Sequence, residues 1–391
     1  MRILFDLITP SSFVGGAGEY IRTVFFALVD AVKSNKSGHT EIVGIYDSSI
    51  GRFAYEDLSP SSLQKMNIST VDVAGKTFGQ VIKENCIDKV FIGAAQYWGR
   101  ERYQPWTIDV PMVCVIHDLC EEEYVSVNWN YYVMIDHPYQ LFKRMLRDRI
   151  RGKKQLNEMK SIMRMMDNNR NVDIITVSNY SKSALAYHFG LKDRVHTLYS
   201  PERLFRSSDV IENPVLADLV GSGKRFYLMV SANRNMKNPN KAVNAFKRYL
   251  EVNFDKDAEK PMLVSLGYPQ PKFKEHICLP YLSDSDLTNA YANCYAFLFP
   301  SYFEGFGYPP LEAMRFGKPV LASNVTSIPE ISGDAAIYFS PIYETEIFHA
   351  LLKLTDENYK DFSGKSLEQY LKINTRQKED LHKVIDLILQ Q

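Results

Sequence analysis

The chain has 391 residues, too many for one typical domain and enough for two domains that each bury a hydrophobic core. Its 46 basic and 46 acidic residues give a formal net charge of zero, so the overall balance does not indicate a nucleic-acid partner. No apolar run reaches the roughly 18 residues of a membrane-spanning helix, and the segment MRILFDLITP is expected to be a first strand rather than a signal peptide.

Short apolar runs alternate with helical patterns along the first half of the chain, as is typical of a buried parallel sheet. Strands are expected at 2–8, 41–46, 89–93, 111–117 and 173–177, and a helix at 19–33. Residues 199–223 are rich in Ser, Pro and Gly and are expected to form a linker.

The alternation then restarts. Strands are expected at 226–230, 261–266, 295–300, 319–322 and 336–339, and helices at 239–252, 284–293, 309–316 and from 366 to 391. The predicted fold class is α/β, with a Rossmann-like domain at 1–205, a second at 206–370, and a C-terminal helix at 371–391 that packs back on the first. Ligands of such sheets bind beyond the carboxyl ends of the strands, so two such domains are expected to face each other across a cleft.

The strongest motif follows the predicted strand at 295–300 and places Glu304 and Glu312 eight residues apart. Gly305 and Gly307 let the backbone approach a ligand closely, and Pro309 suits the first turn of a helix. Glu312 is expected within that first turn, where the helix N-terminus favours a phosphate or a sugar oxygen. The alternative is a solvated loop glutamate followed by an ordinary first-turn acid.

This segment resembles the E-x7-E region of retaining GT-B glycosyltransferases of family 4, the group 1 glycosyltransferases. Several further segments resemble that family in the same order, and they lie at 230–238, 277–283, 327–330 and 333–336. The resemblance implies that Glu312 holds the donor ribose and that Glu304 contacts the donor sugar. It also implies that backbone N–H groups of Phe306 and Gly307 reach the sugar.

The resemblance further implies a basic pair that binds the donor diphosphate. Lys237 matches the family lysine, while the family arginine is displaced and Arg234 is the nearest candidate. Two cations would stabilise the charge that builds on the leaving nucleoside diphosphate. A solvated loop lysine is the alternative for Lys237.

The first half of the chain supplies two weaker features. Gly15 and Gly16 open a predicted strand-to-helix turn that is suited to phosphate, and the turn resembles the family's glycine loop. His117 ends a predicted strand and matches a family histidine that faces the donor sugar. It would donate to a sugar hydroxyl or steady positive charge through its carbonyl; the alternative is a structural histidine.

No cofactor or metal site is expected, because the nucleotide-sugar is a co-substrate and the GT-B type needs no bound divalent ion. Asp284 and Asp286 are one residue apart but are interpreted as a helix start. The resemblance to retaining enzymes implies front-face attack, in which the leaving phosphate takes the proton of the acceptor.

The predicted function is therefore transfer of a hexose from a nucleotide-sugar to a glycan or lipid-linked saccharide in polysaccharide or lipopolysaccharide biosynthesis. Mannose from GDP-mannose is the first expectation, with UDP-sugars next. The alternatives are a nucleotide-sugar epimerase or phosphorylase on the same scaffold and a non-catalytic nucleotide-sugar-binding partner protein.

Residues 143–170 are helical in pattern and rich in Lys and Arg. They would form either a solvated basic face, which we favour, or a peripheral contact with the inner face of the membrane, and pelleting with anionic vesicles distinguishes the two. The five cysteines form no CxxC pair and are expected to be reduced and buried, as in a cytoplasmic protein.

Overall fold

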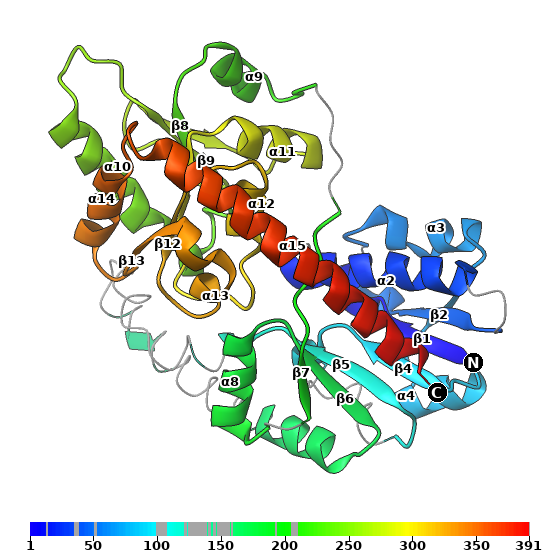
Figure 1. The fold of residues 1–391 in the computed structure, drawn as a ribbon. Coiled ribbons are helices and arrows are strands. Elements are labelled where there is room, and N and C mark those ends of the chain that lie inside the picture. The colour runs from blue at the N-terminus through cyan, green and yellow to red at the C-terminus, as the bar shows by residue number, and fades with distance from the viewer. Residues whose placement is uncertain are drawn as a thin grey trace. The chain divides into compact units, whose positions relative to one another are not determined.

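The computed structural model describes residues 1–391 except 13–14, 35–38, 51–52, 99–107, 121–122, 124–138, 140–141, 144–145, 147–156, 158, 192–193, 205–209 and 391. The chain divides into two compact units, each built on its own parallel sheet (Figure 1). The first unit comprises Met1–Glu123, Arg147–Leu204 and Asn374–Gln391, and the second comprises Tyr124–Leu146 and Phe205–Ile373.

The described part of the first unit contains a seven-stranded parallel sheet with the strand order β3-β2-β1-β4-β5-β6-β7. Its strands are β1 (Arg2–Asp6), β2 (Glu41–Tyr46), β3 (Ser69–Asp72), β4 (Lys89–Ile92), β5 (Met112–Ile116), β6 (Val172–Thr176) and β7 (Val195–Thr197). Its helices include α1 (Ile8–Ser12), α2 (Gly16–Ser34), α3 (Pro60–Lys65), α4 (Phe78–Glu84), α8 (Asn179–Phe189) and a helical stretch at 159–168.

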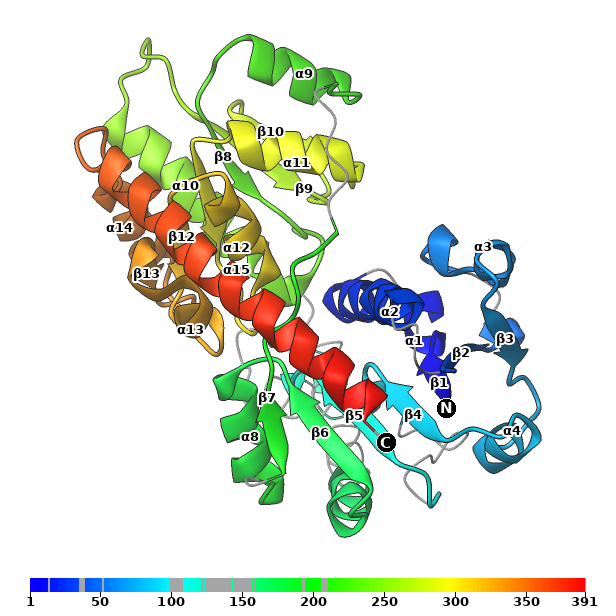
Figure 2. The ribbon, with the colours of Figure 1, turned by 45° about the vertical axis from the view of Figure 1, so that its right-hand side comes forward.

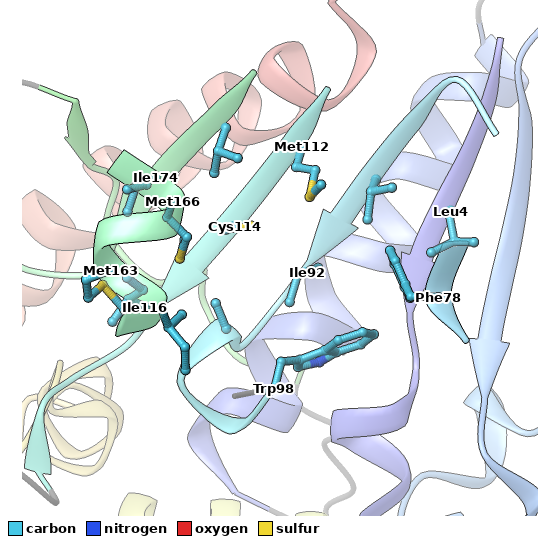
Figure 3. Close-up of a cluster of buried hydrophobic side chains, with 14 of the residues drawn as sticks. Leu4, Phe78, Ile92, Trp98, Met112, Cys114, Ile116, Met163, Met166 and Ile174 are labelled. Carbon is cyan, nitrogen blue, oxygen red and sulfur yellow. The ribbon is translucent and has the colours of Figure 1, made fainter. Parts of the chain in front are cut away.

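The core of the first unit lies between this sheet and its helices. Central strands such as β4 and β5 are buried at every position, as expected for a parallel sheet covered on both faces. Figure 3 shows Ile92, Cys114 and Ile116 from the sheet together with Met163 and Met166 from the stretch at 159–168. The apolar side of that stretch therefore belongs to the core, as the solvated-face interpretation expects, and most of the remainder of 143–170 lies outside the described residues.

The second unit has a six-stranded parallel sheet with the order β10-β9-β8-β11-β12-β13 in its described residues. The strands are β8 (Phe226–Met229), β9 (Met262–Leu266), β10 (His276–Leu279), β11 (Ala296–Phe299), β12 (Val320–Ser323) and β13 (Ala336–Phe339). The helices are α9 (Pro214–Gly221), α10 (Pro239–Asn253), α11 (Asp284–Asn293), α12 (Tyr308–Arg315), α13 (Ile328–Ser332), α14 (Glu344–Lys353) and α15 (Tyr359–Leu389). Apolar clusters cover both faces of this sheet.

The two-domain α/β prediction is confirmed, and most predicted strands agree with the structure to within two residues. The edge strands β3 and β7 escaped prediction because they are short and only partly buried, so neither carries a continuous apolar run. The predicted linker at 199–223 contains α9, whose Asn213 side chain accepts from the first-turn amides. Pro214 begins that helix rather than breaking it.

Helix α15 supplies residues to both units, and its last turns belong to the first (Figures 1 and 2). The buried Lys89 at the start of β4 donates through Nζ to the carbonyls of Leu387 and Gln390, each at 2.6 Å. Both carbonyls lie at the C-terminal end of the helix, where backbone acceptors have no partner within the helix, and Lys89 supplies the missing donor. The contacts fix the end of α15 on the first sheet.

The structure changes the expectation that all five cysteines are buried. All five cysteines are free, but Cys86 is exposed and Cys120 and Cys278 are half-buried, so only Cys114 and Cys294 are buried as expected. Within the described residues, none of the helices combines the length and the apolar character that a membrane span requires.

Candidate functional site

Three loops at the carboxyl ends of neighbouring strands form the candidate site in the second unit. Strand β11 lies between β8 and β12 in the sheet, so the loops that follow these three strands are brought side by side. The amide of Tyr302, after β11, donates to the carbonyl of Met236, after β8, at 2.9 Å. The Ser301 hydroxyl donates to the same carbonyl at 3.4 Å. The two loops are therefore tied together through their backbones.

Lys237 and Glu304 form an ion pair across these loops. The pair is largely removed from water, since the side chains are 9% and 11% exposed. The Lys237 ammonium also lies over the ring of Phe299 at 5.2 Å. Charges this poorly solvated need a partner, and a bound phosphate or sugar would compete for both of them. The structure thus brings together two residues that lie 67 positions apart in the sequence.

Glu312 lies in the second turn of α12 rather than in the first. The helix begins at Tyr308, with Gly307 as its N-cap, so that Glu312 is the fifth helical residue. The predicted helix began one residue later, at 309, and Glu312 was therefore assigned to its first turn. Glu312 is 7% exposed, and a buried carboxylate needs polar or charged partners.

The glycine-containing loop before α12 has the backbone geometry that its sequence indicates. Gly307 has a φ of 110°, a backbone conformation that residues with a side chain rarely adopt. A Cβ at this position would meet no atom within 4 Å, so the requirement for glycine comes from the backbone angle. Phe306 is buried, and its carbonyl accepts from the Ser327 hydroxyl at 2.9 Å. The predicted sugar-binding amides of Phe306 and Gly307 therefore belong to a loop whose backbone is held in place by a hydrogen bond from Ser327.

Arg234 lies on the same loop as Lys237 and is exposed. Its carbonyl accepts from the Lys237 amide at 2.9 Å, which forms the short helical turn Asn235–Lys237 before α10. The two predicted cations are thus joined by one turn of backbone, but only Lys237 is buried.

The predicted helix start at Asp284 is confirmed. The Ser283 side chain accepts from the Asp286 amide as the N-cap of α11. The Asp286 carboxylate accepts from the amides of Glu212 and Asn213, at 2.8 and 3.0 Å, and so anchors the segment before α9. No cluster of metal-ligating side chains occurs among the described residues.

His117 follows β5 in the first unit and is buried. Its Nε2 lies 2.8 Å from the carbonyl of Gly93, which can only accept, so Nε2 carries the proton. The His117 carbonyl accepts from the Ser181 hydroxyl at 3.0 Å, and the ring meets Tyr20 edge to face. Burial lowers the pKa of His117 to about 4. The ring is neutral near pH 7, and its own donor is already used by the protein.

Acidification is expected to destabilise the first unit between about pH 6.5 and pH 4. The pKa of His117 falls from 6.5 to about 4 on folding, so the unfolded chain takes up the proton first. The stability that neutral His117 contributes is complete above about pH 6.5 and is lost as the pH falls toward the folded-state pKa. The total loss below that pKa is about 3 kcal/mol. Denaturant unfolding as a function of pH measures this loss.

The matched comparison uses His117→Gln and His349→Gln, since His349 is exposed on α14. The first variant should flatten the pH dependence and the second should leave it unchanged. An unaltered slope in His117→Gln would contradict the assignment of this loss to His117.

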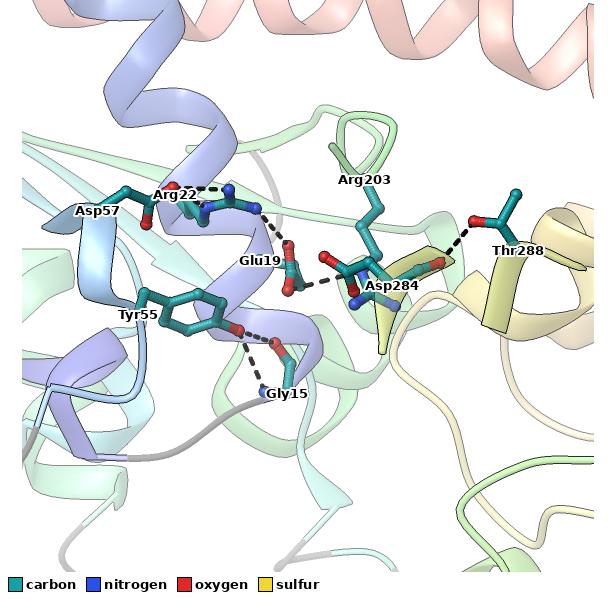
Figure 4. Close-up of polar contacts among 8 residues, drawn as sticks. All are labelled: Gly15, Glu19, Arg22, Tyr55, Asp57, Arg203, Asp284 and Thr288. Carbon is teal, nitrogen blue, oxygen red and sulfur yellow. Dashed lines mark hydrogen bonds and ion pairs between the residues drawn. The ribbon is translucent and has the colours of Figure 1, made fainter. Parts of the chain in front are cut away.

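Gly15 and Gly16 lie at the start of α2, next to a cluster of charged side chains (Figure 4). The hydroxyl of Tyr55 is 3.4 Å from both the amide and the carbonyl of Gly15. A Cβ on Gly18 would come within 2.8 Å of the Tyr55 ring, so glycine is required for this close approach. The turn is thus packed against Tyr55, a residue that belongs to no sequence motif.

The charged cluster beside this turn links distant parts of the first unit. Arg22 pairs with Asp57 at 2.6 Å and with Glu19 at 3.6 Å, and Glu19 also lies 3.5 Å from Arg203 (Figure 4). The Arg22–Glu19 pair has helical i,i+3 spacing, but sequence spacing gives no signal for the contacts of Asp57 and Arg203. The cluster fixes the first turn of α2 and, with it, the glycine turn.

Comparisons with known proteins agree with this architecture. Residues 218–378 match the family model described as "Glycosyl transferases group 1". One segment is 44% identical over 86 residues to an O-antigen chain mannosyltransferase B from Escherichia coli, covering 22% of this chain and 23% of that protein. The match thus spans less than a quarter of that relative.

Solved structures resemble the whole chain. Sucrose-phosphate synthase from Thermosynechococcus elongatus has a TM-score of 0.65 at 14% identity, covering 100% of this chain and 98% of that one. Anabaena HepE in complex with UDP-glucose has a TM-score of 0.63 at 16% identity, with coverage of 98% and 100%. At such identities the likeness establishes the fold, which is GT-B. The chain therefore has the GT-B fold, and its residues 218–378 match the model of the glycosyl transferases group 1 family.

Proposed function

We propose that this chain is a retaining glycosyltransferase that moves a hexose from a nucleotide-sugar to a glycan or lipid-linked saccharide. The observation that carries the proposal is the buried Lys237–Glu304 pair, which lies at the carboxyl ends of neighbouring strands within a group 1 domain. A cation and a carboxylate beside each other suit a donor with an anionic leaving group and a hydroxyl-rich sugar.

Four residues of the second unit have proposed roles in this reaction. Lys237, assisted by Arg234, binds the diphosphate and stabilises the charge that develops on it as the glycosidic bond breaks. Glu304 exchanges its contact with Lys237 for the donor sugar, and Glu312 accepts from the ribose hydroxyls. The leaving phosphate takes the acceptor proton as the new bond forms on the same face, which retains the anomeric configuration. This step needs no metal ion.

GDP-mannose is the proposed donor, and O-antigen or a related polysaccharide is the proposed product. The support is the 44% identity to an O-antigen chain mannosyltransferase over 86 residues. HepE binds UDP-glucose on the same fold, which makes a UDP-sugar the second candidate. A peripheral membrane contact of the basic segment 143–170, which would bring the enzyme to a lipid-linked acceptor, stays a prediction.

GDP-mannose is expected to raise the melting midpoint of the wild-type protein, and Glu312→Ala is expected to lose most of this response. A ligand at a hundredfold excess over its Kd stabilises the folded state by about 2.7 kcal/mol. Loss of one charged acceptor weakens binding by about 1.5–3 kcal/mol, or roughly 10–100-fold. A thermal-shift panel of GDP-, UDP- and ADP-sugars, with and without EDTA, measures both effects.

Glu251→Ala is the matched control, because Glu251 is an exposed glutamate on α10 of the same unit. It should respond like the wild type. A transfer assay, with the product anomer assigned by NMR, then tests retention. If no nucleotide-sugar shifts the midpoint under either condition, the transferase proposal fails in favour of a non-catalytic role.

A further inference from the structure

The loop after β12 holds the backbone of the Glu304 loop through two side chains. Thr326 Oγ1 accepts from the Glu304 amide at 3.1 Å. Ser327 Oγ lies 3.0 Å from the carbonyl of Glu304 and 2.9 Å from that of Phe306, and donates its proton between them. Ser327 is fully buried, so no water competes for these contacts. Both polar groups of the Glu304 backbone therefore bond to consecutive residues of the neighbouring loop.

Thr326 adopts a left-handed backbone conformation, with φ of 52°. This conformation is unfavourable for a β-branched residue and persists only where the surrounding structure imposes it. Among the described non-glycine residues with positive φ, Thr326 is the β-branched one; the others are Asn67, Cys86, Ser231 and Asn238. The strain occurs where the side chain reaches the amide of a proposed catalytic residue, a placement typical of functional sites.

The Glu304 loop is also held from its other side. The Tyr302 amide donates to the Met236 carbonyl, and the Glu304 carboxylate pairs with Lys237 on the same loop after β8. Residues 302–306 are thus fixed between the loops after β8 and β12. Two contacts come from the loop that carries the proposed diphosphate-binding lysine, and three come from Thr326 and Ser327.

We propose that Thr326 and Ser327 are positioning residues that set the direction of the Glu304 carboxylate and of the Phe306 and Gly307 amides toward the donor sugar. The inference rests on the proposed glycosyl transfer. Neither hydroxyl needs to touch the donor, because each acts through the backbone of the loop. Misplacing a reacting group by about 1 Å lowers a rate by about 100-fold, so loss of the contacts should reduce kcat more than donor binding.

The test compares Thr326→Ala with Thr326→Ser and with Ser323→Ala. The first variant removes the hydroxyl, and the second keeps it. Ser323 is a matched control, since it is a fully buried serine on β12 whose hydroxyl donates to the Phe299 carbonyl rather than to the Glu304 loop. For each protein, kcat and the KM for GDP-mannose are measured, together with hydrogen exchange of the Glu304 amide in the full chain.

Thr326→Ala is expected to lower kcat by about 10–100-fold while the donor KM changes by less than about threefold. Its Glu304 amide should exchange faster than that of the wild type, because it has lost its acceptor. Thr326→Ser should retain both the rate and the protection, and Ser323→Ala should resemble the wild type. Thr326 is half-buried, so its substitution by alanine leaves the core intact.

Unchanged exchange and unchanged kcat in a folded Thr326→Ala protein overturn the inference, as does an equal loss in Ser323→Ala. If the wild type transfers no sugar from any donor, the proposed function fails separately. The exchange measurement then still decides whether Thr326 holds the Glu304 amide, since it requires no activity.

Discussion

Lys237→Met is expected to lower the transfer rate by about 10²–10³-fold, since removal of one preformed charge-stabilising group has an effect of this size. The substitution also leaves the Glu304 carboxylate, 11% exposed, without its cation. Breaking a buried ion pair in this way costs about 3 kcal/mol of folding stability. Both effects are measurable, by a transfer assay and by denaturant unfolding.

The double variant Lys237→Met with Glu304→Gln separates the two effects. It removes the uncompensated charge, so stability should return toward the wild-type value. Activity should stay low, because neither the cation nor the carboxylate is restored. Recovery of activity together with stability would show that Lys237 serves folding alone.

Lys241→Met is the control for loss of a lysine close to the site. Lys241 lies on α10, is half-buried, and donates through Nζ to the Ile342 carbonyl. It should transfer sugar at a rate near that of the wild type. A comparable loss in both lysine variants would point to a general electrostatic effect rather than to a role of Lys237.

Asp380→Ala is expected to lower the free energy of unfolding of the first unit by about 1–3 kcal/mol. Asp380 is 2% exposed on α15 and accepts from the Tyr199 amide at 2.9 Å. Arg376 and Lys383 also donate to it, at 3.2 and 2.9 Å. Alanine would remove the acceptor of the buried Tyr199 amide, whereas the Arg376 and Lys383 side chains, 39% and 59% exposed, keep their contact with water. Denaturant unfolding monitored by a probe in the first unit measures the loss.

Asp361→Ala provides a comparison on the same helix. Asp361 is exposed and pairs with Lys365 one turn away, a pair worth about 0.5 kcal/mol or less. If the two variants lose equal stability, Asp380 does not fix α15 to the first unit. A similar melting profile for wild type and Asp380→Ala would lead to the same conclusion.

The central strands and the helix starts were predictable because their signals are local. Strand β11 is a short run of buried apolar residues, and α11 begins at a serine cap, so sequence patterns located both. The helix after Gly307 was also located, with an error of one residue. Because of this error, Glu312 was predicted in the first turn, whereas it lies in the second. The exact start of a helix depends on the backbone angles at the N-cap, which the sequence does not reveal.

The contacts that shape the candidate site were not predictable in the same way. The sheet order places β11 beside β8 and β12, although β9 and β10 lie between β8 and β11 in the sequence. That order brings Lys237 to Glu304 and Thr326 to the Glu304 amide. Thr326 carried no sequence signal at all, because a threonine in a loop does not reveal a left-handed backbone.

The sequence by itself determined two α/β domains, the elements near their centres, and the residue types on which the proposed chemistry depends. These depend on apolar periodicity and on capping residues, which act over a few positions. Only the tertiary structure decided which loops meet, which charges are buried together, and how α15 ends on the first unit through Lys89 and Asp380. Such contacts depend on strand order and on the return of a distant helix, and no local pattern encodes either.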